Sequence, residues 1–168
     1  LAQVQNQTAD QMAELLRDRY DDDFRLDTTQ RIAVGTETAP ALWSGHQLVN
    51  NDFSTVDSFT NTLAGAVVAT IFVRDGDDLV RVTTSLKKED GLRAIGTKLD
   101  RQHPAYATLM KGEPFWGPAL LFGRDYITHY HPLLDEKKQV IGAVFIGLDF
   151  TQSLADLKKR IESVKVGD

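Results

Sequence analysis

The sequence predicts an α+β domain built around one central antiparallel sheet of five strands. Two runs rich in β-branched residues, Val67–Val73 and Leu79–Leu86, flank an Asp-Gly turn, a pattern typical of a β-hairpin. Three more strand-like runs follow one another, joined by short polar turns: Pro114–Phe122, Tyr126–Leu134 and Val140–Phe150. The last run is almost wholly apolar, so we expect it to be buried on both faces.

Helical patterns enclose these strands at both ends of the chain. Residues 1–20 predict one long helix whose apolar stripe comprises Leu1, Val4, Thr8, Met12, Leu15 and Leu16. Residues 151–166 predict a second, with apolar residues every 3.5 positions at Phe150, Leu154, Leu157, Ile161 and Val164. Two interpretations of this second helix remain open. It packs on its own domain, or it carries a signal onward into a dimeric helix.

Smaller elements connect the first helix to the hairpin and the hairpin to the later strands. Phe24–Val34 alternates like a strand, and Gly35–Trp43 predicts a loop because it contains Pro40. A helix is expected before Gly65, and a short one at Pro104–Lys111. With the connecting segments on one face of the sheet and the N-terminal helix on the other, the layout is PAS-like, with a core at 24–150.

The composition excludes several classes of function. The 168 residues are 42% apolar and 26% charged, which is ordinary for a globular domain. The net charge of −5 leaves no basic footprint for nucleic acid. The absence of cysteine rules out disulfides, thiol catalysis and Cys-based zinc sites. No Gly-rich phosphate loop and no Gly-x-Ser-x-Gly motif occurs. We therefore expect neither an enzyme nor a cofactor.

The chain contains no run of 18 apolar residues, so it predicts no transmembrane helix. It begins at Leu1, without methionine, inside a helical pattern. We expect it to be part of a longer protein whose missing flanks include membrane spans.

Three long runs carry a resemblance to a known family: LVNNDFSTVDSFTNTLAG (48–65), ATIFVRDGDDLVRVTTSLKKEDGLRAIGTKLD (69–100) and HPAYATLMKGEPFWGPALLFGRDYITHYHPLLDEKKQVIGAVFIGLDF (103–150). Together they resemble the extracytoplasmic single-Cache sensor domains of bacterial methyl-accepting chemotaxis proteins over about residues 42–150. The subtype resembled senses small carboxylates such as acetate and propionate. More distant relatives sense citrate or C4-dicarboxylates. The turn at 136–139 departs from the Gly-containing turn of many members, which alters only a surface hairpin.

The resemblance implies a whole domain over 1–168 in the periplasmic portion of an inner-membrane chemoreceptor. Its helix at 1–20 would lead out of one membrane span and its helix at 151–166 into the next. The implied partners are a small organic acid and, in the full-length receptor, a second copy of the chain. The output domain is not fixed by the resemblance, since histidine kinases carry similar sensors.

The strand Tyr126–Leu134 is the expected ligand-reading surface. Alternation divides its side chains into Tyr126, Thr128 and Tyr130 on one face and Ile127, His129 and His131 on the other. Citrate-sensing relatives have cationic residues where this chain has Thr128 and Tyr130. Hydroxyl groups there suit a smaller and less charged ligand, so we expect the first set to bind it. The alternative is that the tyrosines only pack the sheet.

The cation that would neutralise a carboxylate is expected from one of two regions. Arg101 and His103 precede the short helix, in the segment that closes over the pocket in this family. Arg81 lies on the hairpin strand, where it is expected to share a face with Thr83 and Ser85. By analogy with the citrate-sensing relatives, that strand also contributes ligand contacts.

Aromatic residues near these positions predict the apolar wall of the pocket, with core packing as the alternative for each. They are Tyr106, Phe115 and Trp116. His129 and His131 place two imidazoles on one strand face, but no third ligand follows at a helpful spacing, so no metal site is expected.

Two other hypotheses compete with the sensor. The domain could be a ligand-independent dimerisation or partner-binding module, which the helical stripes at both ends favour. It could also be an enzyme on a PAS-like scaffold, although no motif supports that reading.

Overall fold

The computed structural model describes residues 2–21, 23–63 and 65–151. In chain order the elements are α1 (Ala2–Arg17), β1 (Phe24–Val34), β2 (Glu37–Ser44), β3 (Gln47–Leu48), α2 (Ser54–Thr62), β4 (Val67–Asp75), β5 (Asp78–Thr84), α3 (Pro104–Met110), β6 (Phe115–Leu121), β7 (Arg124–Leu134) and β8 (Val140–Asp149). The expected helix at 151–166 lies, after Thr151, outside the described residues.

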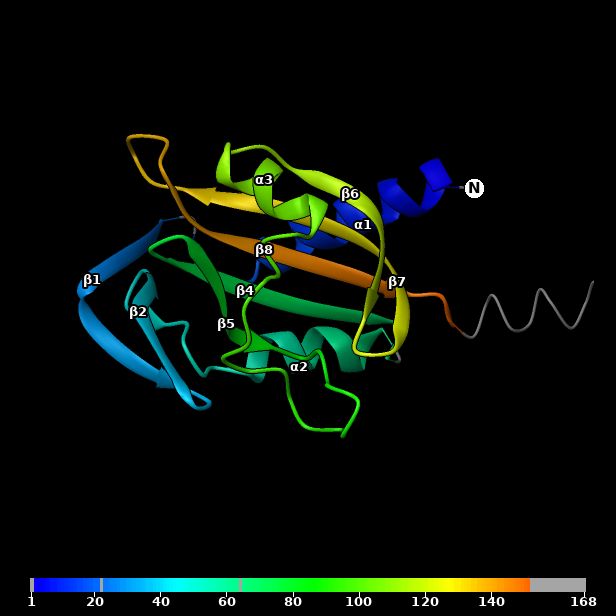
Figure 1. The fold of residues 1–168 in the computed structure, drawn as a ribbon, viewed down its shortest axis with the longest axis horizontal. Helices are drawn as coiled ribbons and strands as arrows, with labels where there is room; N and C mark the ends of the chain where they lie inside the picture. Colours follow the sequence, from blue (N-terminus) through cyan, green and yellow to red (C-terminus); the bar gives the residue numbers. More distant parts are fainter. Residues whose placement is uncertain (1, 22, 64, 152–168) are drawn as a thin grey trace, which may run out of the picture.

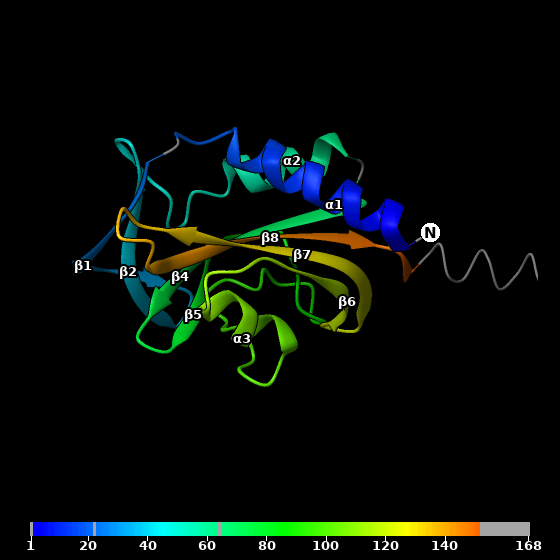
Figure 2. The same cartoon turned by 90° about the horizontal axis from the view of Figure 1, so that it is seen from above.

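A five-stranded antiparallel sheet forms the centre of the domain (Figure 1), in the order β5-β4-β8-β7-β6. The last strand of the chain, β8, is therefore in the middle, and its side chains are buried from Val140 to Gly147. The predicted five strands and the doubly buried final strand are thus confirmed. Figure 2 shows α1 and α2 on one face of this sheet, the α1 face, and α3 on the other, the α3 face.

Each face of the sheet has its own hydrophobic core. On the α1 face, the helix contributes Ala9, Ala13 and Leu16, and Tyr20 just after the helix adds to this core. Leu15 does not belong to the buried stripe as predicted, because it is 51% exposed. The small side chains of Ala9 and Ala13 instead face the sheet. On the α3 face the largest buried side chains are Phe72, Leu79, Leu86, Leu109, Tyr130 and Phe145.

A second sheet of three strands, β1-β2-β3, was not predicted. The segment Gly35–Trp43 was expected to be a loop, yet from Glu37 onward it forms β2, which pairs with β1 along its whole length. Pro40 is tolerated because β2 pairs with β3 only at Trp43 and Ser44, leaving its other edge open at the proline. The backbone groups on this open edge are bound by Asn50, whose side chain donates to the Pro40 carbonyl at 3.0 Å and accepts from Leu42 N at 2.8 Å.

The hairpin strand β5 contains an irregularity that alters which residues share a face. Ile71 pairs with Thr83 and Phe72 with Arg81, so Val82 is an extra residue, a β-bulge. The prediction that Arg81 shares a face with Thr83 and Ser85 is therefore wrong. Thr83 donates to the Asp52 carbonyl at 2.8 Å near α2, whereas Arg81 stacks on the Phe72 ring in the core of the α3 face.

In the part of the chain that the structure describes, no helix has both the length and the hydropathy needed to cross a membrane.

Candidate functional site

Arg81 is a buried cation on the α3 face of the sheet. Its side chain is 4% exposed, and the guanidinium lies 5.0 Å from the Phe72 ring centre. Its hydrogen bonds within the described residues go to neutral oxygens, Thr97 Oγ1 at 2.9 Å and the Lys98 carbonyl at 3.3 Å. Its Nε is buried with no acceptor among those residues. A buried charge without a counter-ion is unusual, because it costs several kcal/mol unless it is paired (about 3–5).

Tyr130 on β7 provides a second buried donor beside Arg81. The side chain is fully buried, and its hydroxyl has no hydrogen-bond partner among the described residues. Burial raises the pKa of Tyr130 to about 12, and the nearby Arg81 charge opposes this rise. The phenol is therefore a neutral donor at physiological pH. A buried hydroxyl left unpaired costs about 1–3 kcal/mol.

His103 completes the group that we call the Arg81 cluster: Arg81, Tyr130 and His103. Its ring lies 5.7 Å from the Tyr130 ring and caps α3 by accepting from Ala105 N at Nδ1, 3.0 Å away. Burial, and to a smaller extent Arg81, lowers the pKa of His103 below its usual value, against the opposing influence of Asp100. Because Nδ1 accepts, the neutral ring carries its proton on Nε2, which is a donor.

Aromatic rings surround the Arg81 cluster. Phe115 lies 5.8 Å from His103 and 6.2 Å from Tyr130, and the Phe145 ring is 4.9 Å from Tyr130. Phe122, in the β6–β7 turn, places its ring 5.7 Å from the Arg81 guanidinium. It does so with a φ of 49°, a left-handed conformation that a bulky side chain rarely adopts. The cluster is thus enclosed by apolar walls.

Three other expected site residues share the α3 face but have different partners. Burial raises the pKa of Tyr126. The nearby Asp149 also raises this pKa, and Arg124 opposes the rise. Thr128 donates to the Gly117 carbonyl at 2.7 Å. Tyr106 on α3 donates to the carbonyl of Asp77 in the β4–β5 turn.

Two expected site residues lie apart from the cluster. The Arg101 side chain is 53% exposed and pairs with Asp78, with Nε 3.0 Å from the carboxylate. Trp116 is 41% exposed and stacks on His129 at 4.9 Å, on the α1 face. The position of Trp116 follows from the alternation of β7. Trp116 packs on His129, which points to the opposite face of the sheet from Tyr130.

The two histidines that were weighed as metal ligands lie beneath α1. Their rings are 6.0 Å apart, and His129 Nε2 is 3.5 Å from an Asp10 carboxylate oxygen. The described residues contain no group of three side chains placed to hold a metal ion.

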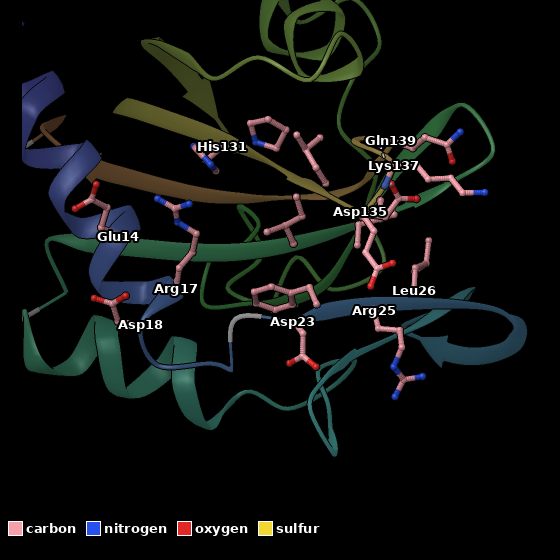
Figure 3. Close-up of a pocket in the computed structure, with 16 residues that line it drawn as sticks. Glu14, Arg17, Asp18, Asp23, Arg25, Leu26, His131, Asp135, Lys137 and Gln139 are labelled. Carbon is pink, nitrogen blue, oxygen red and sulfur yellow. Dashed lines mark hydrogen bonds between the residues drawn. The ribbon is translucent and has the colours of Figure 1, made fainter.

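A separate groove of about 1090 Å³ opens on the α1 face. Figure 3 shows Arg17 and Glu14 from α1, Asp23 just before β1, Arg25 from β1, and His131 from β7 around it. Its lining mixes acids and bases and is open to solvent. We therefore choose the Arg81 cluster, with its buried donors that are unpaired among the described residues, as the candidate site in preference to the groove.

The Arg81 cluster can perform one kind of chemistry, the binding of an anion. A guanidinium, a phenol and an imidazole N–H are all donors, and charge-assisted hydrogen bonds to a carboxylate are about twice as strong as neutral ones. None of the three side chains is a nucleophile activated by a neighbouring base. The single full positive charge fits one carboxylate.

Sequence reasoning missed two residues of this site. Thr97 reaches Arg81 because residues 96–99 run back alongside β5, with Arg81 N donating to the Thr97 carbonyl at 2.9 Å. Phe122 reaches it because the β6–β7 hairpin curls over the sheet (Figure 2). No local pattern signals either approach, although Gly123 does mark the turn that carries Phe122.

The family model of the Cache 3/Cache 2 fusion domain matches residues 1–168. The chain belongs to this family. Cache domains are extracytoplasmic sensor modules of chemoreceptors and histidine kinases, and such signalling domains are typically not enzymes. The predicted α+β, PAS-like Cache fold is confirmed.

No curated protein sequence matches this Cache domain. Among solved structures, the GAF domain of A. aeolicus nlh2 in an inactive state is similar, with 12% identity and a TM-score of 0.45, covering 98% of this chain and 93% of that one.

Proposed function

We propose that this Cache domain is the periplasmic sensor of an inner-membrane chemoreceptor and binds a small monocarboxylate at the Arg81 cluster. The observation that carries the proposal is a pair of buried donors, Arg81 Nε and Tyr130 Oη, that have no acceptor among the residues that the structure describes. A carboxylate between them satisfies both donors and neutralises the buried charge.

The walls of the cluster determine the class of acid. Phe72, Phe115 and Phe145 provide apolar surface around a single cation. A second carboxylate on the ligand would have no counter-charge there, which favours acetate- or propionate-like acids over C4-dicarboxylates. One methylene group changes affinity by only about 1–3 kcal/mol, so both monocarboxylates are expected to bind.

The test is calorimetric titration of the chain with acetate, propionate, pyruvate, lactate and C4-dicarboxylates, together with thermal melts. We expect binding of at least one monocarboxylate, with a rise in melting temperature that grows with its concentration. Stabilisation by none of these acids would refute the ligand class.

A second expected result concerns the phenol. Tyr130→Phe should weaken monocarboxylate binding roughly tenfold to a hundredfold, because it removes one hydrogen bond to a charged group. The free energy of unfolding without ligand should stay the same or rise, since the variant removes an unpaired buried hydroxyl. Calorimetry and chemical denaturation measure the two effects. Tyr126→Phe is the matched control on the same strand, and equal losses for both variants would argue against the assignment.

One observation favours a second candidate, a ligand-independent dimerisation module. Tyr130 is fully buried and Arg81 nearly so, which means that the site is closed by its own side chains. Sedimentation with and without acetate separates the two functions, because the module alone would show the same association in both and no calorimetric signal. In either case we propose that the full-length receptor is a homodimer.

A further inference from the structure

A buried histidine on the α1 face plays no part in anion binding. His129 is fully buried, and neither ring nitrogen has a hydrogen-bond partner among the described residues. It lies on the same strand as Tyr130 but points to the opposite face, beneath α1. A neutral imidazole has one N–H donor and one acceptor, so both are left unused.

Charged groups face His129 from two elements. From α1, the Asp10 carboxylate is 3.5 Å from Nε2, and Arg17 is close enough to disfavour a second positive charge. From β7 itself, the His131 ring is 6.0 Å away. Trp116 on β6 contributes an uncharged ring at 4.9 Å.

On the adjacent strand β8, His129 is paired with Ile146, an apolar residue that is fully buried. A proton added to His129 therefore meets one carboxylate, two cationic or ionisable neighbours and an apolar surface. Burying such a charge is costly, and moving α1 away from the sheet relieves that cost by admitting water.

Solvent reaches the edge of this region. His131 is half-buried and lines the 1090 Å³ groove together with Arg17 and Glu14 (Figure 3). Protons from the solvent can therefore reach His131, and the His129 ring lies 6.0 Å from the His131 ring, further inside the domain.

We propose that His129 is a proton-binding site that makes the docking of α1 on the sheet sensitive to pH, with acid favouring release of the helix. This input is independent of the carboxylate site, because it uses the other face of the sheet. The ligand in this case is the proton itself.

The direction of the effect follows from linkage. Burial lowers the pKa of His129 from 6.5 to about 4, and burial also lowers the pKa of His131. Since the docked state holds both rings neutral, its stability is complete above pH 6.5 and is lost as the pH falls from 6.5 towards 4. At pH 5 the His129 shift alone increases the opening equilibrium roughly thirtyfold.

The test is native-state hydrogen exchange of the α1 amides in the 168-residue chain at pH 8 and pH 5, after division by the intrinsic exchange rates. Wild type should open roughly thirtyfold more readily at pH 5, and His129→Gln should remove most of that change. His46→Gln, which alters an exposed histidine in the β2–β3 turn, should match wild type. A wild-type pH response in His129→Gln would overturn the proposal.

A second measurement keeps the proposal testable if His129→Gln does not fold. The pKa of His129 is followed by NMR in Arg17→Gln and Asp10→Asn, both of which alter α1. Removing the cation should raise this pKa and removing the carboxylate should lower it, because their charges act on the imidazolium with opposite sign. An unchanged pKa in both variants would contradict the proposed geometry.

Discussion

Arg81→Met is expected to reduce monocarboxylate affinity at least roughly a hundredfold, the largest effect on binding that we predict. The substitution removes the single full charge of the cluster and at least two N–H donors while keeping a long, flexible side chain. At the same time the free energy of unfolding should rise by about 1 kcal/mol, because a buried charge held by neutral oxygens is replaced by an apolar group. Calorimetry and urea denaturation of the same preparations measure both.

Arg101→Gln is the matched control for this experiment. Arg101 was also expected to contact the ligand, but its side chain is 53% exposed in an ion pair with Asp78. Its removal should leave affinity unchanged. If Arg101→Gln abolished binding and Arg81→Met did not, the carboxylate would have to bind at the exposed surface around Arg101 rather than in the core of the domain.

Gly142→Ala should cause the largest loss of stability, about 3 kcal/mol, which corresponds to a fall in melting temperature of roughly 6–12 °C. Gly142 lies on the central strand β8, paired with Val73 on one side and Leu133 on the other. A Cβ atom there would lie 2.2 Å from the Phe72 carbonyl oxygen, which is backbone and cannot rotate away. The strands would have to separate.

Gly117→Ala provides the comparison for thermal denaturation. It adds the same methyl group on the edge strand β6, where the nearest atoms belong to the Phe115 ring, 3.0 Å away. A side-chain ring can shift, so the loss should be below about 1 kcal/mol. Similar losses in the two variants would show that backbone crowding at β8 is not what makes Gly142 necessary.

The large sheet could be predicted because its strands have strong local patterns. The apolar run at Val140–Gly147 and the Asp-Gly turn at 75–76 each specify their structure within a few residues. The sheet containing β2 could not be predicted in this way. There, Pro40 indicates a loop, whereas in the structure β2 pairs with β1, and Asn50, ten residues away, binds the backbone groups around the proline.

The candidate site was also predictable only in part, because local patterns can be read from the sequence and contacts between distant residues cannot. Alternation along β7 places Tyr130 and His129 on opposite faces without any knowledge of the fold. Arg81 was an expected cation, but its surroundings depend on contacts distant in the sequence, with Thr97 and Phe122. Whether a cation is buried or exposed is a tertiary property, so Arg81 and Arg101 could not be distinguished from the sequence alone.

Because of the bulge in β5, which side chains face the site depends on the number of residues in this strand as well as on their type. With Val82 as the extra residue, Leu79, Arg81, Thr84 and Leu86 all face α3. A deletion of one residue between Arg81 and Thr84 would restore strict alternation and turn the guanidinium toward α2. Relatives that differ by a single insertion or deletion in this hairpin can therefore exchange a cationic site for a neutral one without any substitution in the strand.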